Sequence, residues 1–380
     1  MTAGRFITHV VGLTTVVVAC ATVTAQTPGT SAPVVTEARR RELLQAAEAL
    51  TSETLADVLR RAEAGDVEAQ VLAGIALGDG KVVPKDMDRA GHWIRTAAEK
   101  NHPTAQTMLG NLYNTGTGMP QDSQKAVEWY AKAAAQGYAQ AQTSLGWAYL
   151  EGQGLRANPV EAVRLFRLAA EQGNARGQVG LGYVYALGKG VDKNEREAVA
   201  WYRKAAEQGE PAAQNTLGFV YENGKGVRKD KDEAAKWYKK ASEQGDAEGS
   251  FHYGRLYLQK PGPGRTDPVG TRVAVDSLKL SSEQGYPVAA FVLGEVFSYR
   301  LFPYHVTKDN LEACTWYVIA SNLDKQGQWE MEQPEPIAAM RKDLPGRIDK
   351  VRKGLGTTER AECERRASDW MTAHSQGRRE

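Results

Sequence analysis

Apolar, small and polar positions alternate along the chain in a pattern that repeats every 36 residues. Each period contains a segment of the form Ala-x3-Leu-Gly-x2-Tyr, as between Ala141 and Tyr149, and a segment of the form Ala-x2-Trp-Tyr-x2-Ala, as between Ala126 and Ala133. In both segments the apolar residues lie three or four positions apart, which is the spacing of an amphipathic helix. Helices this short are not stable alone, so the pattern predicts an all-α fold of stacked helix pairs.

The period is marked by a glycine near the middle of the first helix of each pair. Glycine in a helix costs roughly 0.5–1 kcal/mol relative to alanine, so its recurrence requires a compensating gain. Without a side chain the two helices of a pair can approach closely. We therefore expect the large Trp and Tyr rings of the second helix to be buried there, at about 1.5–3 kcal/mol for each large apolar side chain. These glycines are Gly74, Gly110, Gly146, Gly182, Gly218, Gly254 and, after an insertion, Gly294.

A second series with the same spacing follows the last turn of the second helix, where a left-handed backbone favours Gly or Asn. Asp or Asn residues stand at the expected N-caps of the second helices. The Gly-x-Gly pairs before them, such as Gly116 and Gly118, are expected to form turns, because they lack the Gly-x4-Gly-Lys-Ser/Thr pattern of a phosphate loop. The second series is Gly65, Asn101, Gly137, Gly173, Gly209, Gly245 and Gly285, and the caps are Asp122, Asn158, Asn194 and Asp230.

The pattern spelled by residues 213–245, with Leu-Gly in its first helix and Trp-Tyr in its second, resembles the Sel-1-like repeat, a relative of the tetratricopeptide repeat. The resemblance covers residues 66–325 as seven units, of which the sixth has Ser277 and Leu278 in place of Trp-Tyr. It implies a right-handed α-solenoid whose concave wall is lined by the first helix of every unit. It also implies regulatory or assembly roles in signalling and envelope biology.

Both ends of a solenoid need caps, because the terminal units would otherwise expose an apolar face. Residues 36–65 are expected to supply two helices as the N-terminal cap. At the other end we expect an irregular connection containing a helix over residues 326–356 and a capping helix over 357–374, with Trp370 on its apolar side. Residues 375–380 are expected to form a tail.

The start of the chain has the composition of a targeting segment. About fifteen mostly apolar residues follow Arg5, and small residues and a Pro-bearing linker come next, so residues 1–25 are expected to be an export signal and 26–35 a linker. In the alternative, residues 1–19 are a lipoprotein signal and Cys20 is acylated. A buried N-terminal helix or strand is a third interpretation. An export signal would give a periplasmic protein. A lipoprotein signal would give an outer-membrane lipoprotein that contacts the membrane only through its lipid.

The net charge bears on the class of partner that the protein binds, and the cysteine content bears on the redox state of its compartment. The formal net charge is only +2, so the strong basic excess typical of nucleic-acid-binding proteins is missing. Apart from Cys20, the chain has only Cys314 and Cys363. In an oxidising compartment these two residues are candidates for one disulfide across a separation of 49 residues, and the alternative is two separate thiols.

No local signature of catalysis is found in the sequence. The histidines lack HExxH spacing, the cysteines cannot form a CxxC metal site, and Gly-x-Ser-x-Gly and Ser-x-x-Lys motifs are missing. We therefore expect a protein without catalytic residues, metal or cofactor. Some cysteine-rich members of the resembling family carry a β-lactamase label, but this chain lacks their cysteine pairs. A β-lactamase-like or cell-wall-modifying enzyme remains the alternative.

We expect function to lie at non-repeating positions of the concave wall, which would bind another protein or an extended peptide. The hypothesis is an aromatic ladder of Trp147, Tyr183 and Phe219, since aromatic residues and Arg are common interface anchors. In the alternative, these rings pack against the next helix or the insertion loops. The ladder is flanked by candidates for hydrogen bonds to a peptide and for binding a carboxylate: Asn111, Thr143, Asn215 and Arg255.

Overall fold

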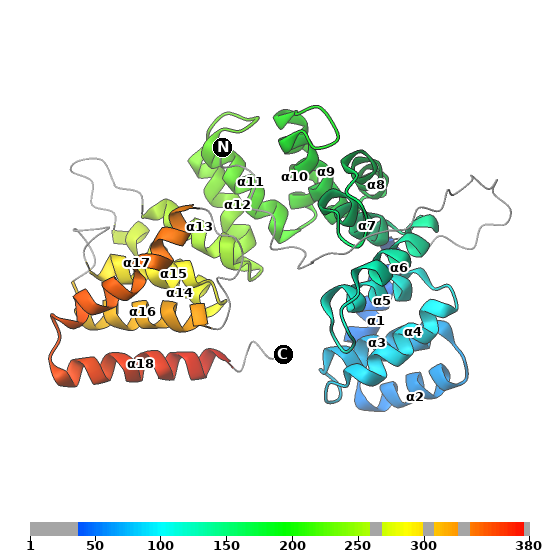
Figure 1. Cartoon of the computed structure of the whole chain (residues 1–380), viewed down its shortest axis with the longest axis horizontal. Coiled ribbons are helices and arrows are strands. Elements are labelled where there is room, and N and C mark those ends of the chain that lie inside the picture. The colour runs from blue at the N-terminus through cyan, green and yellow to red at the C-terminus, as the bar shows by residue number, and fades with distance from the viewer. Residues whose placement is uncertain (1–36, 259–267, 299–307, 326–334, 376–380) are drawn as a thin grey trace. The chain divides into compact units, whose positions relative to one another are not determined.

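The computed structural model describes residues 37–258, 268–298, 308–325 and 335–375 (Figure 1). All of the secondary-structure elements assigned in these ranges are α-helices. The expected export signal (1–25), its lipoprotein alternative with Cys20, the linker (26–35) and tail residues 376–380 lie outside the described residues. No helix in the described ranges has both the length and the apolar character that crossing a membrane requires.

Seven helix pairs follow one another along the described chain, which confirms the prediction of an all-α solenoid. The first helices are α3 (Val67–Asp79), α5 (Pro103–Thr115), α7 (Ala139–Glu151), α9 (Ala175–Leu187), α11 (Pro211–Asn223), α13 (Ala247–Tyr257) and α15 (Pro287–Phe297). The second helices are α4 (Met87–Glu99), α6 (Ser123–Ala135), α8 (Pro159–Glu171), α10 (Glu195–Glu207), α12 (Lys231–Glu243), α14 (Pro268–Glu283) and α16 (Asn310–Leu323). The flanking helices are α1 (Glu37–Glu48), α2 (Ser52–Glu63), α17 (Glu335–Arg352) and α18 (Thr357–Ser375).

The chain divides between Gln208 and Gly209 into two compact units, which are described separately. The N-terminal unit contains α1 to α10, and the C-terminal unit contains α11 to α18. Within each unit, the two helices of a pair pack against each other, and the second helix of one pair packs against the first helix of the next.

The mid-helix glycines lie directly against aromatic rings of the second helices. A Cβ atom placed on Gly110 would lie 2.5 Å from the ring of Tyr130, and one on Gly182 would lie 2.7 Å from the ring of Tyr202. Real Cβ atoms do not approach rings this closely, so only glycine fits at this helix separation. The same relation holds for Gly146 with Phe166, Gly218 with Tyr238 and Gly294 with Tyr317.

The tryptophans beside these tyrosines have a different environment. Trp129 and Trp201 are half-buried, and the Nζ atoms of Lys132 and Lys204 lie 3.8 and 3.9 Å from their ring centroids. The expectation that both rings of the pair are buried is therefore wrong for Trp129 and Trp201, whereas Trp237 and Trp316 are buried. Successive residues on a helix point about 100° apart, so only one of the two can face the glycine.

The capping predictions are confirmed. Asn101 has a φ of 66° and is the only non-glycine residue with positive φ among those described, while the equivalent Gly137 has 83°. The Asp122 side chain accepts a hydrogen bond from the backbone N–H of Lys125 at 3.0 Å, as an N-cap should. Gly116, with a φ of 70°, ends α5, so the Gly-x-Gly pair forms a turn.

In four pairs, a buried glutamine of the first helix accepts a hydrogen bond from a glutamine that follows the second helix. The side-chain amide of Gln136, after the end of α6, donates to Gln106 Oε1 of α5 at 2.7 Å. Gln106 in turn donates to the carbonyl oxygen of Ala98 in the preceding pair at 3.3 Å. Equivalent bonds within pairs join Gln172 to Gln142, Gln208 to Gln178 and Gln244 to Gln214, at 2.8, 2.8 and 2.7 Å.

At the C-terminal end, α17 and α18 both pack against α16. Helix α17 is longer than the irregular sequence of residues 326–356 suggested, because it continues past Pro345 while Leu344 and Val351 are buried in the core of this unit. Helix α18 spans the segment expected to form the C-terminal cap. Its Trp370 packs against the core of this unit, edge-on to Trp316 with ring centroids 6.0 Å apart.

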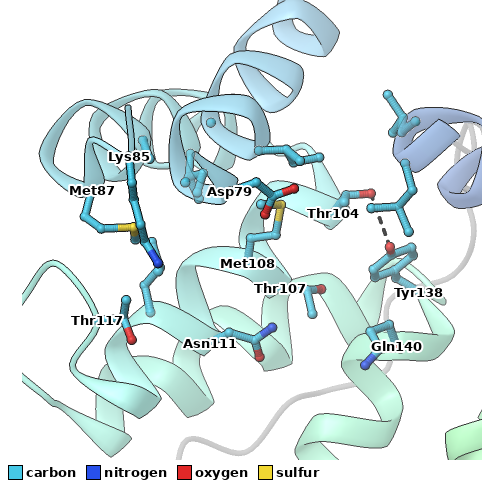
Figure 2. Close-up of a pocket in the computed structure, with 18 of the residues that line it drawn as sticks. Asp79, Lys85, Met87, Thr104, Thr107, Met108, Asn111, Thr117, Tyr138 and Gln140 are labelled. Atoms are coloured by element: carbon cyan, nitrogen blue, oxygen red, sulfur yellow. Dashed lines mark hydrogen bonds between the residues drawn. The ribbon is translucent and has the colours of Figure 1, made fainter. Parts of the chain in front are cut away.

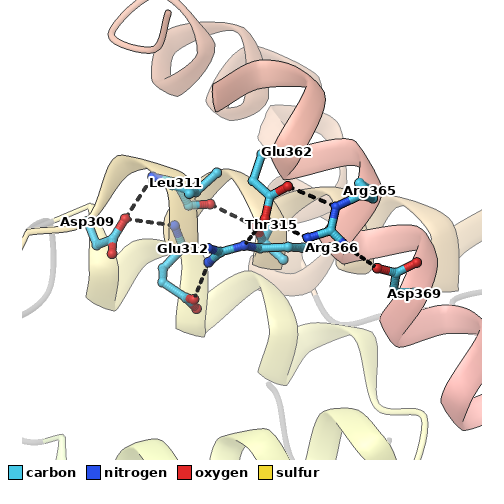
Figure 3. A network of polar contacts seen from close by, with 8 residues as sticks. All are labelled: Asp309, Leu311, Glu312, Thr315, Glu362, Arg365, Arg366 and Asp369. Carbon is cyan, nitrogen blue, oxygen red and sulfur yellow. Dashed lines mark hydrogen bonds and ion pairs between the residues drawn. The ribbon is translucent and has the colours of Figure 1, made fainter. Parts of the chain in front are cut away.

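Helix α18 is also held by covalent and charged contacts. Cys314 of α16 and Cys363 of α18 form a disulfide. Arg366 donates to Glu362 of its own helix at 2.9 Å and to Glu312 of α16 at 3.2 Å (Figure 3). The last helix pair is thus covered by a helix fixed through a disulfide, an aromatic contact and an ion pair.

The contact between glycine and ring predicts different effects on stability for two Gly-to-Ala substitutions. Gly182→Ala should lower the free energy of unfolding by about 1–3 kcal/mol, because its Cβ would overlap Tyr202. Gly78→Ala is the matched control within the same unit, because its Cβ would lie 3.7 Å from Ala90, an ordinary contact. It should be neutral or stabilising by up to about 1 kcal/mol. Urea unfolding of both variants measures the difference, and equal effects would contradict the steric argument.

The disulfide predicts that the C-terminal unit responds to reduction. Reduction should lower its free energy of unfolding by about 2–4 kcal/mol, because a closed loop of this length restricts the unfolded chain. Thermal melts with and without reductant measure the effect. A Cys314→Ala/Cys363→Ala variant should melt at the same temperature with and without reductant. A wild-type melt that ignores the reductant would show that the bond makes no contribution.

Candidate functional site

A cavity of about 430 Å³ lies in the N-terminal unit, on the face formed by the first helices (Figure 2). Its lining combines residues of the first helices α3, α5, α7 and α9 with residues of α1, of the second helix α4 and of the loops that follow α3 and α5. Apolar side chains contribute one part of the lining: Leu43, Leu44, Ile75, Met87, Ala90, Ile94, Met108 and Leu112. Polar side chains contribute the rest: Asp79, Lys85, Thr104, Thr107, Asn111, Thr117, Tyr138, Gln140 and Arg176.

The repeat geometry brings these residues together. Residues at the same position in successive first helices lie on the same face of the stack. We call the face of the first helices that contains the cavity the groove. A position that faces the groove therefore recurs every 36 residues. Thr104 and Gln140 are one such pair. The Thr104 hydroxyl donates to the Tyr138 hydroxyl at 3.3 Å, and this bond links the start of α5 to the start of α7 (Figure 2).

Two charges of opposite sign lie on the cavity lining. Asp79 ends α3 and Lys85 precedes α4, and neither forms an ion pair with another described residue. A charged side chain without an ionic partner retains its electrostatic attraction for a ligand of the opposite sign. The cavity therefore offers apolar contact area together with one acidic and one basic contact.

Asn111 is the predicted partner-binding residue that lies in this cavity. Its side chain is exposed, and its Oδ1 accepts a hydrogen bond from the Tyr130 hydroxyl at 2.8 Å. This bond fixes the amide orientation and leaves the NH₂ group without a partner among the described residues. Asn111 can therefore donate to a carbonyl oxygen of a bound chain.

Trp147 and Tyr183 lie next to each other, but they pack into the helix stack. Trp147 is only 6% exposed, and its ring centroid lies 5.1 Å from that of Phe166 and 5.4 Å from that of Tyr183. Burial raises the pKa of Tyr183. Thr143 is buried as well and donates to the Asn174 side chain at 3.1 Å. These contacts correspond to the alternative interpretation, in which the rings join neighbouring helices.

The other three residues that we predicted to bind a partner belong to the C-terminal unit. Each of them contacts another residue of that unit. The Asn215 side chain donates to Glu248 of α13 at 3.1 Å. Phe219 is half-buried, with Lys225 Nζ 4.8 Å from its ring centroid. Arg255 donates to both carboxylate oxygens of Glu222 at 2.6 Å, so the carboxylate that it binds in this structure belongs to its own chain.

A buried polar cluster surrounds Glu222 in this unit. Glu222 accepts a hydrogen bond from the Tyr238 hydroxyl at 2.9 Å, and the His252 ring stacks on Tyr238 at a centroid distance of 5.1 Å. Burial, with the positive charge of Arg255, lowers the pKa of His252 to about 3. The histidine is therefore neutral at pH 7, which suits a packing role rather than proton transfer.

Groups of three or more His, Cys, Asp or Glu side chains arranged to hold a metal ion are not found among the described residues.

Sequence reasoning missed most of the cavity because it followed two positions of the first helix. A third position, six residues before the mid-helix glycine, also faces the groove. The residue type at this position differs from repeat to repeat. This variation is the feature of the sequence that could have indicated a binding position. In the first four units the residues at this position are Glu68, Thr104, Gln140 and Arg176, of which the last three line the cavity.

Comparison with known proteins agrees with this architecture. The model of one protein family, described as the Sel1 repeat, matches residues 67–102, 103–138, 139–174, 175–210, 211–246 and 287–325. Residues 247–286, which form the pair α13 and α14 and lack the Trp-Tyr motif, fall between the matched segments. No curated protein matches the chain.

Solved structures similar to this chain are also found. A Sel1 repeat protein from Oxalobacter formigenes is 33% identical, with a TM-score of 0.54, covering 63% of this chain and 68% of that one. An immunity protein from Pseudomonas aeruginosa is 24% identical, with a TM-score of 0.42, covering 58% of this chain and 82% of that one.

The packing of Trp147 predicts a stability effect that separates it from Phe219. Trp147→Ala should lower the free energy of unfolding by about 3–5 kcal/mol, because it removes a buried ring. Phe219→Ala should cost clearly less, because that ring is only half-buried. Chemical unfolding followed by circular dichroism measures both. A small loss for Trp147→Ala would instead favour a binding role for this ring.

Proposed function

The chain belongs to the Sel1 repeat family, and from this premise we propose that it is a non-enzymatic scaffold that binds another protein through its first-helix groove. Sel1 repeat proteins are helical scaffolds that typically mediate contacts between proteins. The observation that carries the proposal is the cavity in the N-terminal unit, where Asp79 and Lys85 lie beside apolar side chains without ionic partners among the described residues.

The lining of this cavity suits a protein segment. Met87 and Met108 are flexible and polarizable, so they can adapt to apolar side chains of different shapes. Asn111 and Gln140 supply amide groups that can bond a peptide backbone. Apolar anchors surrounded by polar groups are typical of surfaces that recognise proteins.

We further propose that the protein acts outside the cytoplasm, as an adaptor in the bacterial envelope. The apolar segment after Arg5 and the small residues that follow it support export. The disulfide between Cys314 and Cys363 supports an oxidising compartment. In this proposal the partner is a protein or an extended peptide, the protein needs no cofactor, and lipid attachment at Cys20 is the one route to a membrane.

Site-specific cross-linking tests the groove. A photoreactive phenylalanine at Asn111, inside the cavity, should form covalent adducts with an envelope protein after illumination. The same group at Glu171, an exposed residue of α8 outside the cavity, is the matched control and should give no adduct. Adding Gln140→Arg to the Asn111 chain should reduce the yield about tenfold, because it places a large charged side chain in the cavity.

Two outcomes would overturn this proposal. Equal labelling from Asn111 and Glu171 would show that the groove does not select a partner. Turnover of a chromogenic β-lactam or of peptidoglycan by the purified wild-type chain would show that the protein is an enzyme.

A further inference from the structure

Helix α1 does not extend the solenoid but lies on the groove face of the first repeats. Ala47 packs into the same core as Val71 and Ile75 of α3, and Leu43 is 4% exposed. Leu43 and Leu44 also line the cavity. The chain thus places one of its own helices where a partner segment would bind.

The contacts of α1 follow one helical face. Arg39 donates to Glu68 of α3 through Nε at 3.1 Å and Nη2 at 2.5 Å. Arg39, Leu43 and Ala47 are spaced by four residues, so they lie on one side of the helix. This side of α1 carries one basic group followed by two apolar groups. The basic group meets the acidic Glu68 of the first repeat.

Few of the described side chains of α1 are buried. Between residues 41 and 48 only Leu43 and Ala47 are buried, whereas the other side chains are exposed. The adjacent α2, in contrast, buries Leu55, Val58 and Ala62 and has a capping box at its start. A helix that buries so little surface can leave its site without unfolding the repeats.

Helix α1 also fills the groove incompletely. Leu44 remains 38% exposed although it lines the cavity, and Met87 and Met108 lie on the same lining. The remaining space of about 430 Å³ is large enough for further apolar side chains. A helix with larger side chains at these positions would bury more surface and bind more tightly than α1.

We propose that α1 is an intramolecular stand-in for the partner, and that the partner is an amphipathic helix that replaces α1 in the groove. The partner helix carries a basic residue for Glu68 and apolar residues four and eight positions later, with a larger apolar side chain directed into the cavity. This inference rests on the proposed function and adds the chemistry of the partner and its competition with α1.

The test uses a fluorescent peptide of residues 37–50 as the probe and the full chain as the receptor, with binding measured by fluorescence anisotropy. Leu43→Asp should release α1 and increase the affinity for the peptide by about tenfold or more, because the groove is then vacant in most molecules. Gln45→Asp is the matched control, since it adds the same charge on the exposed side of α1, and it should bind like the wild type.

Changes in the peptide test its recognition. Arg39→Glu in the peptide should weaken binding to the Leu43→Asp chain about tenfold, and adding Glu68→Arg to that chain should restore it. Leu44→Phe in the peptide should strengthen binding by about threefold or more, because the larger ring fills the cavity.

Equal affinity of the peptide for the wild type, Leu43→Asp and Gln45→Asp chains would overturn the inference. So would a folded Leu43→Asp chain that does not bind the peptide. If the Leu43→Asp chain does not fold, hydrogen exchange of the wild type decides: amides of α1 should exchange about tenfold faster than those of α2, and equal rates would refute a displaceable helix. Cross-linking at Asn111 that persists when these tests fail would leave the proposed function intact and refute only this inference.

Discussion

The close approach of the two helices in each pair is the constraint on which the rest of this structure depends. A ring of the second helix occupies the place where the first helix would carry a Cβ atom, as Tyr202 does against Gly182. The contact fixes the helix separation, and the larger buried ring offsets the low helix propensity of glycine. Where the ring is replaced by a smaller apolar side chain, the glycine remains: Ile94 packs against Gly74 and Leu278 against Gly254. The close contact at the glycine is therefore kept in these pairs, although the residue that makes it differs.

This constraint leaves some positions of the first helix to other purposes. The residues that hold a pair together face the second helix, whereas those on the groove side contact the neighbouring repeat or a ligand. In the third and fourth repeats, Trp147 and Tyr183 serve the contact between repeats. In the second repeat, the equivalent Asn111 is exposed on the cavity lining. The same position in the repeat thus stabilises the stack in one unit and is available for binding in another.

This difference explains which features of the structure could be predicted from the sequence. Periodicity identified the helix pairs, the caps and the left-handed residues, including Asn101, because each depends on local backbone geometry. It could not decide whether Arg255 is open, since that depends on Glu222 in the neighbouring repeat, which the period alone does not pair with it. The cavity was equally hidden, because α1 forms part of its lining and lies outside the repeat pattern.

Helices outside the repeats cover groove-side positions at both ends of the described solenoid. In the N-terminal unit, α1 bonds Glu68 and packs on Ile75 of the first repeat. In the C-terminal unit, Arg347 of α17 forms an ion pair at 2.9 Å with Glu295, the residue after the mid-helix glycine of the last repeat. A terminal repeat lacks a neighbour on one side, and in the first repeat α2 covers that side by packing against α3. Helix α1 instead lies on the groove side. Because the cap does not depend on α1, competition between α1 and a partner leaves the end of the stack covered.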